Sequence, residues 1–343
     1  MDTKKTVNTS IEKPDFTKYM DFALAKMGGK VLYATDDFFA EKENLIKQKE
    51  AVFIADKYTD RGKWMDGWES RRKRTSGHDW AIVQLATPIR IRGFNVDTAH
   101  FLGNHPPFAS IEAIHLAADE VPEDWTKAEL DWTEILPKSP LAPGSYNYYT
   151  SSNRIKPYTH LKLHIYPDGG VARLRVYGEV RKDWSRHPAD ELVDLASAIE
   201  GGKSIRCNDM FFSHIDNLLM PNRGANMGDG WETKRNRTPN NRDWVIVRLA
   251  HAGSIEKINV DTCHFKGNYP DTCSIEACYV ENEENIMDDD VEWKTLLPKQ
   301  KLSADKEHWF EEEVQTNDRI THVRLNIFPD GGVSRLRLFG KIR

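Results

Sequence analysis

The chain contains an internal duplication, and this feature limits its possible folds more than any other. Four segments recur in the same order, 66–75 at 229–238, 79–86 at 243–250, 95–113 at 259–277 and 167–178 at 329–340. Identical residues occupy 35 of these 49 aligned positions, so one domain has been duplicated and each copy must bury its own core. We expect an N-terminal tail over residues 1–13, a first repeat over 14–182 and a second over 183–343.

Alternation with a period of two residues dominates each copy and predicts β-strands. Leu161, Leu163 and Ile165 alternate with polar residues, and the alternation resumes after the turn-forming sequence Pro-Asp-Gly-Gly at 167–170. This pattern predicts a hairpin with one solvated face. Further strands are expected over 81–85 and 89–96. Because crossover helices are missing between these strands, each repeat is expected to be an antiparallel jelly-roll β-sandwich and not a parallel α/β domain.

A short amphipathic stretch precedes the strands of each copy. It begins at a proline, Pro14 or Pro188, and ends at a glycine, Gly28 or Gly201. Proline near the start and glycine at the end are typical of a helix. We therefore expect a helical lead-in to each repeat.

Composition excludes several classes of function. The net charge of −5 provides no basic field for nucleic acid. No apolar run approaches the roughly 18 residues that a spanning helix needs, and the N-terminus lacks the pattern of a secretory signal. We expect a cytoplasmic protein without nucleic-acid or membrane partners.

The four cysteines fit a reducing compartment. Cys207, Cys263, Cys273 and Cys278 form no Cys-x-x-Cys pair, and they align with Ala34, Ala99, Ala109 and Ile114 of the first copy. Small apolar residues at the equivalent positions favour buried, reduced thiols over disulfides or metal ligands.

Polar residues shared by both copies cluster at the ends of the expected strands. They form three groups: Asp66, Glu69 and Arg72 with Asp229, Glu232 and Arg235; Asp97, His100 and Asn104 with Asp261, His264 and Asn268; and Asp168, Arg173 and Arg175 with Asp330, Arg335 and Arg337. Carboxylates and imidazoles can transfer protons, and guanidinium groups can hold an anionic carboxylate through two hydrogen bonds.

Several of these residues also have a purely structural interpretation. Asp168 and Asp330 lie in turn-forming sequences, and we interpret them as turn residues that cap their own backbone. The tryptophan of the duplicated Asp-Gly-Trp-Glu sequence is interpreted as a core aromatic. For His100 and His264, a catalytic role and a hydrogen bond within the fold both stay open.

Metal and nucleotide chemistry receive little support. His100 and His105 lie five residues apart beside Asp97, but Tyr269 replaces the second histidine in the other copy. No His-Glu-x-x-His, Walker or Gly-x-Ser-x-Gly sequence occurs. No metal ligands and no firm cofactor are predicted, and a divalent metal stays an option without a ligand set.

The duplicated blocks resemble the allantoicase family, and in particular its fungal members. The resemblance rests on Asp-Gly-Trp-Glu-[Ser/Thr]-x-Arg, Asn-Val-Asp-Thr-x-His-Phe-x-Gly-Asn and Pro-Asp-Gly-Gly-Val-x-Arg-Leu-Arg, and it covers the chain from about Pro14 to Arg343. It implies two galactose-binding-like jelly rolls, an activity that converts allantoate and water into ureidoglycolate and urea in allantoin degradation, and a homo-oligomer.

This activity suggests roles for the shared residues. Allantoate carries one carboxylate and two ureido groups on a single carbon, so a site needs a cation, polar partners and proton transfer. The candidate catalytic residues are Glu69, Asp97 and His100 with Glu232, Asp261 and His264. The candidate substrate-binding residues are Arg72, Asn104 and Arg173 with Arg235, Asn268 and Arg335, where Arg173 or Arg335 is expected to clamp the carboxylate. Which copy is active, and whether a site forms between domains or subunits, stays open.

A rival hypothesis comes from another class of protein. Jelly rolls of this type often bind carbohydrates or other small ligands without catalysis, and tandem copies then add avidity. The clustered carboxylate, imidazole and guanidinium groups favour the enzyme.

Overall fold

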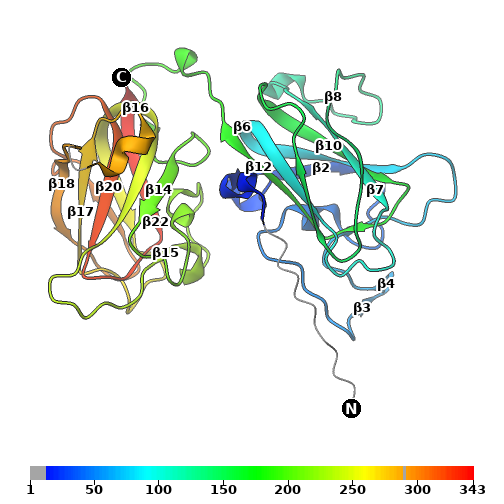
Figure 1. Cartoon of the computed structure of the whole chain (residues 1–343), viewed down its shortest axis with the longest axis horizontal. Helices are drawn as coiled ribbons and strands as arrows, with labels where there is room; N and C mark the ends of the chain where they lie inside the picture. The colour runs from blue at the N-terminus through cyan, green and yellow to red at the C-terminus, as the bar shows by residue number, and fades with distance from the viewer. Residues whose placement is uncertain (1–12, 289–290) are drawn as a thin grey trace. The chain divides into compact units, whose positions relative to one another are not determined.

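The computed structural model describes residues 13–288 and 291–343, so residues 1–12 of the expected tail lie outside it. The chain forms two compact units, the first extending to Glu179 and the second starting at Val180. Each unit is an antiparallel β-sandwich (Figure 1). Within the described ranges, every helical segment is a 3-10 turn of three to five residues. The structure thus confirms two tandem all-β jelly rolls.

The first repeat contains twelve strands among the described residues. They are β1 (Met20–Asp21), β2 (Lys30–Ala34), β3 (Tyr58–Thr59), β4 (Gly62–Lys63), β5 (Trp68–Glu69), β6 (Asp79–Asp97), β7 (Phe108–Ile114), β8 (Thr133–Pro140), β9 (Tyr146–Thr150), β10 (Tyr158–Tyr166), β11 (Gly170–Val171) and β12 (Arg173–Val180). Its 3-10 turns are η1 (Asp15–Lys18), η2 (Ala25–Met27), η3 (Lys42–Ile46) and η4 (Ala118–Glu120).

The second repeat follows the same order. Its strands are β13 (Val193–Asp194), β14 (Lys203–Cys207), β15 (Trp231–Glu232), β16 (Asp243–Asp261), β17 (Thr272–Cys278), β18 (Lys294–Lys301), β19 (Glu307–Phe310), β20 (Ile320–Phe328), β21 (Gly332–Val333) and β22 (Arg335–Ile342). Its 3-10 turns are η5 (Trp184–Arg186), η6 (Ile215–Leu219), η7 (Met227–Asp229) and η8 (Glu283–Met287).

One long strand joins the two layers of each sandwich. The first part of β6 pairs with β2 and β10, and its last part, from Gly93 to Asp97, pairs with β9. β16 behaves in the same way, because it pairs first with β20 and, after a register irregularity between Arg248 and Gly253, with β22. The two strands expected over 81–85 and 89–96 are therefore one continuous strand that changes partners.

The hairpin expected around residues 167–170 does not form. β10 pairs with β6 and β7, whereas β12 lies beside β1 and β6. Gly169 has a left-handed backbone with φ 136°, and the strand after it, β11, pairs with β5 and not with β10. The Pro-Asp-Gly-Gly sequence thus carries the chain from one layer to the other.

The prediction of a helical lead-in to each repeat is also wrong. The stretch from Pro14 to Gly28 contains only η1 and η2, separated by the two-residue strand β1. The Asp21 carboxylate accepts hydrogen bonds from the amides of Ala23 and Val176, which ties this segment to β12 and interrupts a helix. Gly28 and Gly201 do have left-handed φ angles, as expected of segment ends.

The core contains the apolar residues that the alternation of apolar and polar side chains predicted to be buried. Leu161, Leu163 and Ile165 are fully buried, as are their counterparts Val323, Leu325 and Ile327. All four cysteines are free; three are buried, while Cys207 is half-buried. No helix among the described residues is long and apolar enough to span a membrane.

Candidate active site

The candidate site lies at one end of the first repeat, around the two-residue strand β5. Trp68 is fully buried and its Nε1 donates to the carbonyl of Asp36 at 2.8 Å, which anchors the strand. Since side chains alternate along a strand, Glu69 points the opposite way, toward a hollow. Trp231 makes the same bond to the carbonyl of Asp209, also at 2.8 Å. Both tryptophans are core residues, as expected.

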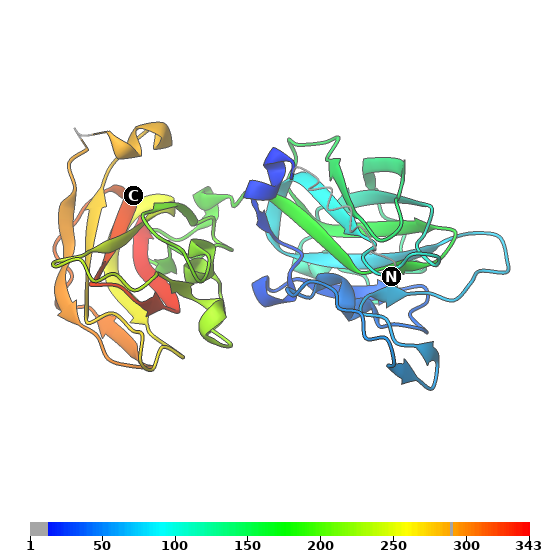
Figure 2. The same cartoon turned by 60° about the horizontal axis from the view of Figure 1, so that its bottom comes forward.

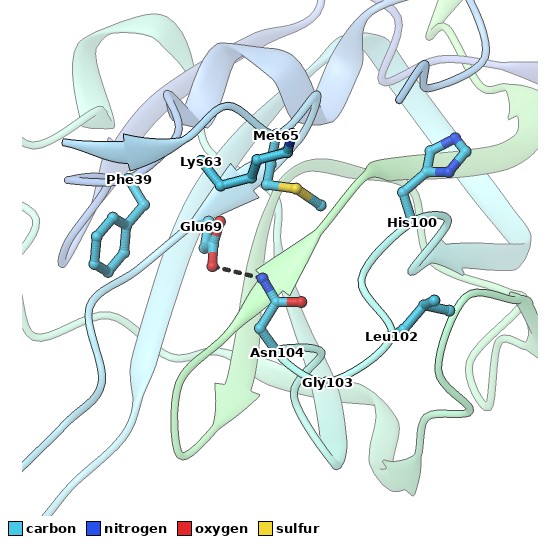
Figure 3. A pocket seen from close by; sticks show the side chains of 8 residues that line it. All are labelled: Phe39, Lys63, Met65, Glu69, His100, Leu102, Gly103 and Asn104. Carbon is cyan, nitrogen blue, oxygen red and sulfur yellow. Dashed lines mark hydrogen bonds between the residues drawn. The ribbon is translucent and has the colours of Figure 1, made fainter. Parts of the chain in front are cut away.

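Glu69 pairs with Asn104, which the sequence placed in a different group. The Asn104 Nδ2 donates to Glu69 Oε1 at 2.7 Å, and Figure 3 shows the two side chains facing each other. Burial raises the pKa of Glu69, although the hydrogen bond from Asn104 opposes that shift. The second repeat repeats the pair, with Asn268 donating to Glu232. The structure thus joins two of the predicted groups.

A close backbone approach fixes Asn104 in place. Its carbonyl accepts the amide of Gly170 at 2.8 Å. A Cβ atom at Gly170 would come within 2.0 Å of the Phe101 ring, so only glycine allows the turn after β6 to meet β11 there. Gly332, Asn268 and Phe265 repeat this arrangement in the second copy.

Two hollows flank the Glu69–Asn104 pair, and we call them together the Glu69 groove. The larger has a volume of about 520 Å³ and is lined on one side by Ser70, Arg72 and Lys73. The smaller has a volume of about 380 Å³; its lining residues are Phe39, Lys63, Met65, Glu69, His100, Leu102, Gly103 and Asn104 (Figure 3). Because both hollows share Glu69 and Asn104, that pair is accessible from each of them.

Arg72 is the available cation of the groove. It is exposed and has no hydrogen bond or ion pair with any described residue. The neighbouring Lys73 is engaged, because its ammonium lies 2.6 Å from Asp79 and its amide donates to Asp168 at 2.8 Å. Asp168 therefore caps another chain segment and not its own backbone, and Asp330 does the same for the amide of Asn236.

The expected carboxylate clamps lie inside the fold. Arg173 is 1% exposed, and its donors reach the carbonyls of Lys49, Asp66 and Ala172. Its Nη2 also lies 2.8 Å from the Asp66 carboxylate. Arg335 is equally buried and pairs with Asp229 at 3.2 Å. Every guanidinium nitrogen of the two arginines has a hydrogen-bond partner within the protein, so each guanidinium joins its strand to the preceding loop.

Asp97 and Asp261 are buried at the ends of the two long strands. The Asp97 Oδ1 accepts the amide of Ala99 at 2.8 Å and so shapes the turn that carries His100. Burial raises the pKa of Asp97 to about 6. Asp261 accepts the amide of Cys263 at 2.8 Å.

Both candidate histidines occupy left-handed backbone positions and bond to a carbonyl. The Nε2 of His100 lies 3.0 Å from the oxygen of Ala51, and that of His264 lies 2.8 Å from the oxygen of Gly224. A carbonyl only accepts, so each Nε2 carries a proton and the lone pair of the neutral ring is on Nδ1. Figure 3 shows the His100 ring turned away from the Glu69–Asn104 pair. The ring stacks on Phe53.

The comparison of repeats missed one wall of the groove because only the first copy has it. The connection between Ala51 and Asp66 has 14 residues, whereas that between Gly224 and Asp229 has four. The extra residues contain the β3–β4 hairpin, which projects from the first repeat (Figures 1 and 2) and supplies Lys63 and Met65 to the smaller hollow. The difference in length between the two connections was the sequence signal that could have indicated this extra wall.

The described residues contain a metal-ligand group, but not at the place that the sequence suggested. Side chains of Cys263, His264 and Asp305 offer ligand atoms that all lie within 4.8 Å of one another. The group of Asp97, His100 and His105 does not meet that geometry among the described residues.

Fold and site together define a class, that of duplicated jelly-roll proteins with an acid–amide pair beside a free guanidinium. The allantoicase repeat family matches residues 20–181 and 193–343. A probable allantoicase of Pseudomonas fluorescens is 52% identical over 96% of this chain and 98% of its own. A probable allantoicase of Burkholderia mallei is 50% identical over 96% of each chain. The crystal structure of allantoicase from Saccharomyces cerevisiae matches with a TM-score of 0.76 and 37% identity, covering 94% of this chain and 93% of that one.

The chain belongs to the allantoicase family. This membership confirms the sequence resemblance, although the bacterial relatives above share more identical residues with the chain than the yeast protein does. It also disfavours the rival hypothesis of a non-catalytic carbohydrate-binding protein.

Proposed function

We propose that this protein hydrolyses allantoate to ureidoglycolate and urea, and that the reaction takes place in the Glu69 groove of the first repeat. Family membership supports the substrate. The observation that carries the location is the Glu69–Asn104 pair, which lies between two hollows and next to the Arg72 guanidinium, which has no partner among the described residues. The groove thus combines a proton donor, an amide and a cation.

Each part of allantoate has a partner in this groove. Arg72 binds the carboxylate, because a guanidinium can form two parallel hydrogen bonds with it. Asn104 holds the Glu69 carboxyl through its 2.7 Å bond and so orients it. We place the second ureido group in the smaller hollow, beside His100 and Lys63.

Glu69 can serve both proton transfers. In its protonated form it donates to the nitrogen of the departing urea as the bond from that nitrogen to the central carbon breaks. The nitrogen of the remaining ureido group forms a transient double bond to that carbon. Water then adds to the carbon, and the Glu69 carboxylate accepts the proton that water releases. A pKa raised by burial favours the protonated form that begins this cycle.

Two differences support the first repeat as the active copy. Among the described residues, the β3–β4 hairpin is present only there, and it lies beside the aromatic pair Phe38 and Phe39. Their side chains are 38% and 36% exposed, against 66% and 62% for the equivalent Phe211 and Phe212. The first copy therefore offers the more enclosed groove.

The duplication supplies a matched control for the test. We expect Glu69→Gln to lower kcat for urea release at least about 100-fold, because general acid–base catalysis typically contributes that much. Glu232→Gln changes the same residue type in the second copy and should leave most of the activity. Urea and ureidoglycolate would be measured together, with circular dichroism to verify folding. Loss in the Glu232→Gln variant alone would contradict the choice of repeat, and full activity in both would remove this carboxylate from the mechanism.

Two further properties belong to the same proposal. Four unpaired cysteines support a reducing, cytoplasmic location. Consecutive exposed apolar side chains at 210–212 support association of the chain with copies of itself. No nucleic-acid or membrane partner is proposed.

A further inference from the structure

We propose that Cys263, His264 and Asp305 of the second repeat form a binding site for a divalent transition metal of the Zn²⁺ class. Their ligand atoms lie within 4.8 Å of one another, and they come from the turn after β16 and from the loop before β19. This site is separate from the Glu69 groove and does not depend on the proposed function.

The histidine is already oriented for metal binding. Its Nε2 donates to the carbonyl of Gly224 at 2.8 Å, which fixes the tautomer and leaves the lone pair on Nδ1. Metal-binding histidines characteristically donate their other ring nitrogen to a carbonyl or carboxylate, because that bond orients the ring.

The other two ligands are held close to the histidine. The amide of His264 donates to Asp305 Oδ1 at 2.7 Å, which holds this carboxylate beside the histidine. The amide of Cys263 donates to Asp261 Oδ1 at 2.8 Å, which fixes the backbone that carries the thiol. Three elements of the site are thus positioned by hydrogen bonds that a metal need not break.

The first repeat shows what the same fold does without the extra ligands. It has Ala99, His100 and Gly144 at the equivalent positions, and it keeps only the bond from the imidazole to a carbonyl. Gly144 and Asp305 both have left-handed backbones, with φ 58° and 50°. The thiol and the carboxylate therefore accompany the histidine in the second copy only. In the first copy, alanine replaces the cysteine and glycine replaces the aspartate.

The ligand set selects the kind of metal. One thiolate, one imidazole and one carboxylate suit Zn²⁺ or Co²⁺ better than the oxygen-seeking Mg²⁺ or Ca²⁺. Tetrahedral ligands at 2.0–2.3 Å from zinc lie roughly 3.5 Å from each other, so the three groups, which lie within 4.8 Å, need to approach by no more than about 1.3 Å. Water would complete the fourth position.

Binding exchanges a proton for the metal. The Cys263 S–H bond breaks, its electron pair forms the bond from sulfur to the metal, and the proton leaves to solvent. Because binding releases this proton, the apparent affinity should rise with pH. No oxidant or reductant takes part.

Cobalt provides a readout that is independent of activity. Titration of the whole protein with Co²⁺ should produce a near-ultraviolet thiolate-to-cobalt band that saturates at one equivalent per chain. Cys263→Ala should abolish this band, and Asp305→Gly should weaken binding at least about tenfold, as loss of a ligand or its support does. Zn²⁺ added afterwards should remove the band by competition. Both substitutions introduce residues that the first repeat carries at the same places.

Cys207→Ala is the matched control, because Cys207 is the half-buried thiol of the second repeat and aligns with Ala34. It should leave the cobalt band unchanged. The proposal is overturned if the folded protein gives no band at pH 8, if the band survives Cys263→Ala, or if Cys207→Ala removes it. The band, and not urea release, decides the outcome, so failure of the proposed catalytic site would not affect this test.

Discussion

The buried guanidinium of Arg173 stabilises the fold. It neutralises the carboxylate of Asp66. Burial alone would raise the pKa of Asp66, but Arg173, the amide of Val52 and Lys47 together outweigh burial, so the pKa lies below its ordinary value and the carboxyl is ionised. Arg173→Met leaves that carboxylate and three carbonyls without their partner, and we expect the free energy of unfolding to fall by about 3–5 kcal/mol. Urea denaturation measures this loss.

Arg72→Met is the contrasting variant at the residue scale. Its guanidinium is exposed, so the free energy of unfolding should stay within about 0.5 kcal/mol of the wild type, while KM for allantoate rises. If Arg173→Met were as stable as the wild type and raised KM instead, the sequence-based assignment of Arg173 as the carboxylate clamp would be restored.

Asp97 makes a prediction about pH and stability. Its folded pKa of about 6 lies above the ordinary value of 3.8, so between these values the folded state binds more protons and stability falls as pH rises. Asp97→Asn removes this cost. The variant should match the wild type near pH 3.5 and be more stable by about 3 kcal/mol at pH 7.5.

The equivalent aspartate of the second repeat controls for this effect. Asp261 has the Arg223 guanidinium 3.3 Å away, so Asp261→Asn also removes an ion-pair partner and should give no such gain at pH 7.5. Equal pH profiles for wild type and Asp97→Asn, measured by urea denaturation, would contradict the shift. Retained turnover in Asp97→Asn would identify Asp97 as a positioning residue for the His100 turn.

At the scale of elements, the sequence predicted the kind of structure better than its pairing. Alternating side chains identify strands because burial on one face is a local property. Pairing depends on where the chain goes next: the Gly169–Gly170 turn leads into β11 beside β5, which no local pattern of β10 or β12 indicates. The continuous β6 was predicted as two strands for the same reason.

The candidate site divides in a similar way. The sequence identified Glu69 and Asn104 as candidates because the duplication repeats both residues. It did not predict that they contact each other, because 35 residues separate them along the chain. The structure buries Arg173 and Arg335 against backbone carbonyls, and the sequence could not indicate this, since a shared arginine has the same sequence signature whether it is buried against carbonyls or faces a ligand. The hairpin that carries Lys63 was missed because a search for repeats discards whatever occurs once.

The β3–β4 hairpin can be tested as a unit. Replacing residues 52–65 with the four-residue connection Ala-Asn-Met-Gly of the second repeat should preserve the fold. The amide that bonds to Asp66 in the first copy, from Val52, has its counterpart in Ala225 bonding to Asp229. Because Lys63 and Met65 leave the groove, kcat/KM for allantoate should fall at least about tenfold. An unchanged kcat/KM in the folded variant would show that the hairpin does not line the active groove.

At the scale of the whole molecule, the two repeats share a scaffold and differ in what surrounds it. The first has the hairpin beside its Glu–Asn pair, and the second has the thiol and carboxylate beside its histidine. Each addition lies in a connection or a turn, where insertions and substitutions leave the sandwich intact. The proposed division into a catalytic copy and a metal-binding copy follows from these local differences.

The same asymmetry bears on assembly. Without a hairpin over them, Met210, Phe211 and Phe212 form a consecutive exposed apolar run in the second repeat, and we expect a further copy of the chain to cover it. Light scattering should then report a mass that is a multiple of 39.5 kDa. Substituting Phe211 and Phe212 together with serine should lower that mass, whereas the same change at Phe38 and Phe39 should impair catalysis more than assembly. A mass of one chain at all concentrations, or an assembly that survives the Phe211 and Phe212 change, would show that this run is not an interface.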